Sequence, residues 1–184
     1  MSKWVYGDIH GAGHEFRTLV RQLHQSGDEH YCVGDLFDRG MDAVVVWETL
    51  QEYGIKSTRG NHEQKMLRFL EGKRDSVPPH YHYALNQLIG RGVVKRDDFI
   101  AFLHQMPNII RVAPNGLVTH GGVNVTDPWL EDDSANIYGH LTEPIPRDTG
   151  MGSEHQFWWD HYHLDTVVFY GHVVHEPGTA RIRR

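Results

Sequence analysis

The chain has 184 residues, 39% of them apolar, which is enough for one domain over 1–184 with a sizeable core. The formal net charge of −6 argues against duplex nucleic acid as the main partner, because proteins that bind it present basic surfaces. No run of about 18 apolar residues is present, and the amino terminus lacks the apolar region of a secretory signal. We therefore expect a cytoplasmic protein without a membrane partner, with its single cysteine, Cys32, as a small core residue.

The first sixty residues alternate between strand and helix patterns. Short apolar runs at 3–7, 31–33 and 55–58 predict strands that end in glycine-rich turns. Between them, apolar residues recur every three or four positions, which predicts two amphipathic helices, the second over 42–53. The predicted buried stripes are Phe16, Leu19, Val20 and Leu23 in the first helix and Ala43, Val46, Trp47 and Leu50 in the second.

Each of these strands runs into a polar, glycine-bordered motif: GDIHG, GDLFDRG and GNHE. Asp8, Asp35 and Asn61 mark the three motifs, and the intervals between them suit one strand, turn and helix unit each. Successive strands of such units are parallel and near neighbours, so the motifs meet at one edge of one sheet. Open α/β sheets bind their ligands at that edge.

The rest of the chain has fewer chemical signals. A helical insert at about 64–106 is expected to pack and to form a wall of the site. Residues 109–112 and 117–119 predict paired strands around a Pro-Asn-Gly turn, and the second strand ends in His120. A loop-like segment at about 124–156 is predicted to shape the substrate pocket, and a last strand at 166–170 ends in Gly171-His172.

The residues that gather at strand ends mix carboxylates, imidazoles and one amide with an arginine. They are Asp8, His10, Asp35, Asp38, Arg39, Asn61, His62, His120 and His172. This donor set suits Mn, Fe or Zn better than Ca, and it is large enough for two ions about 3.5–4 Å apart that share a carboxylate. Arg39 beside the carboxylates indicates a substrate with a phosphate. The alternative to a metal and phosphate site is that these are ordinary turn residues without a ligand.

Eleven further histidines are expected to be surface or core residues without a ligand role. They are His14, His24, His30, His80, His82, His104, His140, His155, His161, His163 and His175. The Phe157-Trp158-Trp159 run is expected to form core or pocket wall rather than a platform for stacking bases.

The motifs GDIHG, GDLFDRG, GNHE, HGG and the late GH follow the order found in calcineurin-like metallophosphoesterases. From Val5 to about His172 the chain resembles their phosphoprotein-phosphatase branch, which includes serine/threonine phosphatases and diadenosine tetraphosphate hydrolases. The resemblance implies an α/β fold, a β-sandwich flanked by helices. It also implies phosphoester hydrolysis with two divalent metal ions, manganese first and iron or zinc as alternatives, and a metal-bridging hydroxide.

Carried over to this chain, the resemblance assigns a role to each motif residue. The first metal would be bound by Asp8 and His10, the second by Asn61, His120 and His172, with Asp35 bridging the two. His62 would be the general acid that protonates the leaving oxygen, oriented by Asp38. The substrate phosphate would be bound by Arg39, with Arg59 and Arg147 as weaker candidates. For Arg59, structural support of the loop is the alternative.

Two departures from the family pattern stand out. No second phosphate-binding arginine precedes the late GH motif, where the chain reads WWDHYHLD. Members of the family also continue past the late histidine with further strands, whereas this chain ends at Arg184. We therefore expect a sandwich that is shortened at its carboxyl end.

The leading functional hypothesis is a serine/threonine-type phosphomonoesterase that acts on a phosphorylated protein. The alternative is a nucleotide-directed enzyme, either a diadenosine tetraphosphate hydrolase or a phosphatase that heals nucleic-acid ends. GNHE rather than GNHD favours the first. A third hypothesis is a metal-binding scaffold without catalysis. The presence of both His62 and Asp38 argues against it, because a scaffold needs neither. The pattern predicts neither the physiological substrate nor the oligomeric state.

Overall fold

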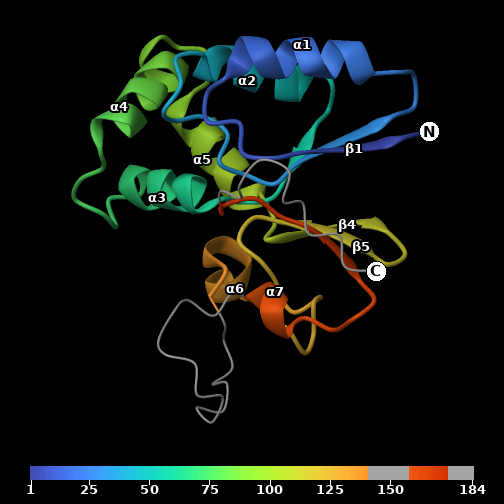
Figure 1. Ribbon diagram of the computed structural model, residues 1–184. Coiled ribbons are helices and arrows are strands. Elements are labelled where there is room, and N and C mark those ends of the chain that lie inside the picture. The colour runs from blue at the N-terminus through green and yellow to red at the C-terminus, as the bar shows by residue number, and fades with distance from the viewer. Residues whose placement is uncertain (141–157, 174–184) are drawn as a thin grey trace.

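A computed structural model describes residues 1–140 and 158–173, and it has helices packed around two small sheets (Figure 1). The first sheet contains β1 (Lys3–Tyr6), β2 (Glu29–Cys32) and β3 (Lys56–Ser57), in that order and all parallel. α1 (Gly13–Leu23) and α2 (Ala43–Glu52) connect the strands. The predicted strand–helix alternation and the parallel neighbours are confirmed.

The buried face of α1 differs from the predicted stripe at one position. Phe16 and Val20 are buried, but Leu19 is 44% exposed. Gly13 explains the difference, because a Cβ built on it would lie 2.5 Å from the Asp42 carbonyl oxygen, at the start of α2. The helix is thus turned toward α2 on its glycine side, which moves Leu19 out of the contact.

The helical segment after the third motif starts earlier than predicted. α3 (Asn61–Leu70) begins within GNHE, so the motif side chains lie in the first turn of a helix. It is followed by α4 (Pro79–Leu85), a π-helical turn η1 (Asn86–Gly90) and α5 (Arg96–Gln105). Their apolar faces join α1 and α2 in the main core, where Met66, Leu88 and Phe99 have no exposed surface.

The second sheet has the order β4-β5-β6. β4 (Ile109–Ala113) and β5 (Gly116–Thr119) form the predicted antiparallel pair, and β6 (Val167–Phe169) lies parallel to β5. The expectation of a loop from 124 was wrong in one part, because α6 (Asp133–Tyr138) lies within it. The Asp132 side chain caps this helix by accepting from the Ser134 amide, and Gly139, at φ 65°, ends it.

The two sheets face each other across a small apolar layer. Tyr31 and Val33 of the first sheet pack with Val112 and Val118 of the second. Figure 1 shows α1 and α2 above this pair of sheets, with α6 and α7 (Trp158–His161) below it. The predicted sandwich with flanking helices is therefore confirmed. Trp158 is buried in the lower core, as expected, whereas Phe157 lies outside the described residues.

Two further observations concern the chain as a whole. In the part of the chain that the structure describes, no helix has the length and apolar character needed to cross a membrane. The carboxyl-terminal residues 174–184 lie outside the described ranges, as do residues 141–157 of the predicted substrate loop. The single domain over 1–184 and the shortened carboxyl end stay predictions.

Candidate active site

Backbone hydrogen bonds join the first two motifs at the carboxyl end of the first sheet. The Ile9 and His10 amides both donate to the Asp35 carbonyl, at 3.1 and 2.8 Å, and the Gly11 amide donates to the Leu36 carbonyl. In return the Gly40 amide donates to the His10 carbonyl at 2.7 Å. The two loops are therefore fixed relative to each other before any side chain is considered.

Left-handed backbone conformations are concentrated in this region. Among the described residues other than glycine, four have positive φ: His10 at 46°, Asp35 at 51°, Arg39 at 71° and His172 at 65°. All four belong to the predicted site. Each such residue costs about 1–3 kcal/mol, and such residues are typical of functional sites.

Glu63, which the sequence had not singled out, ties the second motif to the third. Its side chain has no exposed surface and accepts three backbone N–H groups. The donors are the amides of Asp35 at 2.7 Å, Leu36 at 2.8 Å and Gly60 at 3.1 Å. Burial raises the pKa of Glu63 to about 7, although the amides of Leu36 and Asp35 oppose that rise. One carboxylate thus positions the backbone that carries two candidate metal-binding motifs.

Asp35 lies at the centre of the site. Its carboxylate oxygens are 3.7 Å from His10 Nε2, 3.6 Å from His62 Nε2 and 3.5 Å from His120 Nε2. Burial, and then the neighbouring Glu63 carboxylate, raise the pKa of Asp35 to about 9. A buried carboxylate surrounded by imidazole nitrogens and destabilised in this way is suited to a cation.

His120 and His172 face each other on the other side of Asp35. His120 is fully buried, and its Nδ1 donates to the Val33 carbonyl at 3.0 Å, so the ring's lone pair is on Nε2. That nitrogen is 3.2 Å from His172 Nδ1. Burial, and then His172, lower the pKa of His120 to about 3, so this ring is neutral. A neutral imidazole with a fixed tautomer is the form that binds metal.

Asp8 and Asn61 complete the candidate metal set. The Asp8 carboxylate accepts the His172 amide, at 3.2 and 3.3 Å, and so links the first motif to the last. Asn61 is buried, and its Oδ1 has no hydrogen-bond partner among the described residues. An orphaned buried carbonyl is costly, and a cation beside it would remove that cost. The donor set therefore fits divalent metal ions.

His62 and Asp38 form a close, buried pair beside this set. His62 Nδ1 donates to Asp38 Oδ2 at 2.5 Å, and Arg39 Nη2 lies 3.2 Å from His62 Nε2. His10 Nδ1 is 3.4 Å from the second oxygen of Asp38. Burial acts against ionisation of Asp38, but the hydrogen bonds from His10 and His62 outweigh it. They hold the pKa of this carboxyl well below its usual value.

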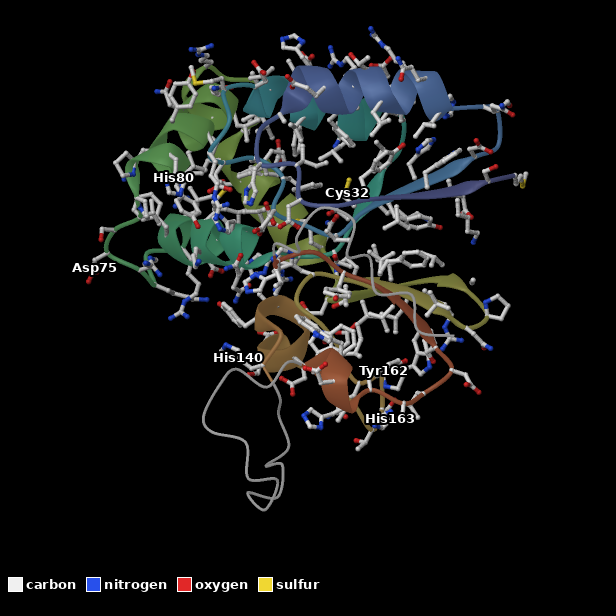
Figure 2. All side chains as sticks on the ribbon, in the orientation of Figure 1. Cys32, Asp75, His80, His140, Tyr162 and His163 are labelled. Carbon is white, nitrogen blue, oxygen red and sulfur yellow. The ribbon has the colours of Figure 1, made fainter. Side chains whose placement is uncertain are left out.

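Two residues of the helical insert reach this pair, although the insert was expected to carry no chemistry. His80 Nε2 is 3.2 Å from Asp38 Oδ2, and the Tyr81 hydroxyl is 2.9 Å from His62 Nδ1. His80 lies in the first turn of α4 and is labelled in Figure 2. Their spacing gives no motif, so only the fold brings them to the site.

The weaker arginine candidates are placed differently. The Arg59 guanidinium donates to the carbonyls of His104 and Met106, at 3.1 and 2.9 Å, and to Gln64 Oε1. These contacts favour support of the loop, the alternative given for Arg59, over binding of the substrate phosphate. Arg147 lies outside the described residues.

Comparison with known proteins agrees with the motifs. Residues 1–176 match the family model described as calcineurin-like phosphoesterase. An asymmetrical bis(5'-nucleosyl)-tetraphosphatase from Anoxybacillus flavithermus is 26% identical over an alignment of 204 positions, gaps included. The alignment covers 94% of this chain and 79% of that protein. Serine/threonine-protein phosphatase 1 from Salmonella typhimurium is 41% identical over 69 residues, covering 35% of this chain and 31% of the phosphatase.

A solved structure gives the same result for the fold. The crystal structure of a putative diadenosine tetraphosphatase superposes with a TM-score of 0.67 at 27% identity, covering 91% of this chain and 73% of that one. The family match extends over nearly the whole chain and includes every residue of the candidate site. The chain therefore belongs to the calcineurin-like metallophosphoesterases, and it is a phosphoester hydrolase.

Proposed function

We propose that this protein is a phosphomonoesterase of the serine/threonine type, in which His62 protonates the leaving oxygen. The buried His62–Asp38 contact of 2.5 Å carries the proposal. An alkoxide from serine or threonine is a poor leaving group, so its departure needs a general acid, which contributes about 10²- to 10⁴-fold to the rate. A departing nucleoside phosphate is already a stable anion and needs that proton much less.

Six residues would hold two divalent metal ions, for which manganese is the first candidate. They are Asp8, His10, Asp35, Asn61, His120 and His172. When bound, such ions neutralise the charge of the phosphate and make water a nucleophile at neutral pH. The unpartnered Asn61 Oδ1 and the fixed tautomer of His120 are the observations that fit this assignment.

The remaining steps belong to the protein's own groups. Asp38 accepts the Nδ1 proton of His62, which fixes the tautomer and directs Nε2 toward the reacting side. Arg39 lies 3.2 Å from that nitrogen, so a phosphate held by the guanidinium has its leaving oxygen within reach of His62. Burial lowers the pKa of His62, and the hydrogen bond to Asp38 opposes that change. The acid is the imidazolium form, which carries a proton on each nitrogen. The leaving oxygen takes the Nε2 proton, and the ring stays behind as the neutral tautomer with its Nδ1 proton shared with Asp38.

A second candidate is the hydrolysis of dinucleoside polyphosphates. It is favoured by two bacterial relatives of that name, which align with 94% of this chain, whereas two serine/threonine phosphatases align with 35% and 62%. The end-healing alternative rests on a loose likeness of the segment 137–172 to the phosphatase module of bacterial end-healing enzymes, and residues 141–157 of that segment lie outside the described ranges. The scaffold hypothesis leaves the buried His62–Asp38 pair without a purpose.

The test compares phosphate release from a phosphothreonine peptide with the turnover of diadenosine tetraphosphate, with added Mn²⁺ and after treatment with a chelator. We expect Mn²⁺-dependent activity that favours the peptide and falls at least about 100-fold in His62→Ala. Faster turnover of the dinucleotide would establish the second candidate instead. Activity that survives the chelator would refute the metal-dependent mechanism.

A further inference from the structure

The residues that surround Asp38 include more partners than the family motifs supply. Asp38 has no exposed surface, and imidazoles approach both of its oxygens. His10 Nδ1 lies 3.4 Å from Oδ1, while His62 Nδ1 and His80 Nε2 lie 2.5 and 3.2 Å from Oδ2. The His10 and His62 contacts are hydrogen bonds, and His80 adds a third imidazole nitrogen within ion-pair distance of the same carboxylate. A buried carboxylate is stabilised by each polar partner that approaches it, so His80 is part of the support of the His62–Asp38 pair.

Tyr81 contacts the other member of the pair. Its ring stacks on the His62 imidazole, with centroids 5.3 Å apart and an interplanar angle of 14°. Its hydroxyl, 2.9 Å from His62 Nδ1, can accept the same hydrogen that Asp38 accepts, as a second and longer partner. Both acceptors favour a proton on Nδ1, and the stacked ring limits rotation of the imidazole.

The start of α4 fixes where these two side chains lie. Pro78 and Pro79 precede them, and a proline at the first helical position has its φ already set for the helix. Further along, Gln87 Nε2 donates to the Met41 carbonyl at 2.6 Å, just after the GDLFDRG motif. The insert is thus attached to the loop that carries Asp38.

The same helix carries a second His-Tyr pair that makes no such contacts with the described residues. His82 and Tyr83 are exposed, and His82 meets the edge of Phe69 instead of the site. The helix therefore presents the same two residue types twice: His80-Tyr81 at the site and, two positions later, His82-Tyr83 on the surface. This difference provides matched controls.

We propose that His80 and Tyr81 are positioning residues for the reaction: Tyr81 holds the imidazole of His62, and His80 holds the carboxylate of Asp38. The proposal rests on the proposed function, because it assumes that His62 protonates the leaving oxygen. It assigns a specific role to the helical insert beyond packing.

The experiment measures kcat for phenyl phosphate and for 4-nitrophenyl phosphate in the Mn²⁺-loaded chain of residues 1–184. Phenolate is the poorer leaving group and depends more on the acid. We expect Tyr81→Phe and His80→Ala to lower kcat about tenfold for phenyl phosphate but about threefold or less for 4-nitrophenyl phosphate. His80→Gln keeps an N–H donor and should recover part of the loss. The controls His82→Ala and Tyr83→Phe should match the wild type with both substrates.

His62→Ala separates the two ways in which the idea can fail. If His62→Ala lowers kcat by the same factor for both substrates, the acid role in the proposed function is wrong. The present proposal is overturned if His62→Ala lowers kcat more for phenyl phosphate than for 4-nitrophenyl phosphate, while the His80 and Tyr81 variants lower both values equally. A general packing defect would lower kcat for both substrates by the same factor. Thermal unfolding of each variant shows whether the fold is intact.

Discussion

Glu63 offers the sharpest test of how the site is held together, because one buried side chain accepts three backbone amides from two motifs. In Glu63→Gln, the amide oxygen can accept from Asp35 and Gly60, which both bond to Oε2 in the wild type. The new NH₂ group then faces the Leu36 amide, so two donors meet. The opposite orientation of the amide loses two bonds instead of one.

The magnitude follows from these bonds. A hydrogen bond to a charged group contributes about 1.5–3 kcal/mol, and an unsatisfied buried donor costs about 1–3 kcal/mol. Against this, Glu63→Gln removes the cost of burying a carboxylate, which is why the pKa of Glu63 is raised to about 7. We expect the lost bond and the donor–donor contact to outweigh that relief, with a net loss of about 2 kcal/mol in the free energy of unfolding.

The assay is urea unfolding followed by tryptophan fluorescence, with the exposed Glu52→Gln as a control on α2. Glu63→Ala, which loses all three bonds, should be destabilised by about 4 kcal/mol or more. If Glu63→Gln were as stable as the wild type, the cost of burying the Glu63 carboxylate would equal the stability that its hydrogen bonds contribute. The role of Glu63 as a structural tie would then be refuted.

Three further predictions concern packing, reactivity and metal binding. Gly40→Ala should destabilise the protein by about 2 kcal/mol, since a Cβ there would lie 2.5 Å from the Gly11 carbonyl; Gly7→Ala, with nothing within 4 Å, should change the unfolding midpoint little. Cys32 is fully buried, and burial raises its pKa, so a thiol reagent should modify it only after unfolding; rapid labelling of the folded protein would contradict this. Mn²⁺ at about 100 times its dissociation constant should add about 2.7 kcal/mol of stability, seen as a higher Tm, and an unchanged Tm would contradict the assigned donor set.

The motifs made much of the site predictable, because their chemistry is local to single strand ends. Asp8, Asp35 and Asn61 were placed at one sheet edge from their spacing alone, and the parallel register of the three strands brings their motifs together. His120 and His172 joined them because each follows a strand of the second sheet. The apolar pattern thus located the strands, and the candidate site residues are those that directly follow them.

The residues that periodicity missed act through contacts between distant segments. Glu63 was treated as the last letter of a motif, yet it bonds backbone groups up to 28 positions away. His80 resembled ten other histidines until the fold placed it against Asp38. Leu19 fitted the apolar stripe, but the close approach allowed by Gly13 rotated it outward. Each result depends on which helix lies beside which loop, and a linear pattern does not contain that information.

The site also shows how a fold can tolerate an unfavourable cluster of groups. Within the described ranges, the ion pairs of Asp35 and Asp38 are all with histidines, and Asn61 Oδ1 has no partner. Four left-handed residues add strain at the same place. The Glu63 hydrogen bonds and the interleaved first two loops hold these groups in position despite that cost. A cation held by Asp35 and Asn61 would offset the cost of burying that carboxylate and that unpartnered oxygen, and the protein's own scaffold already holds both groups in place.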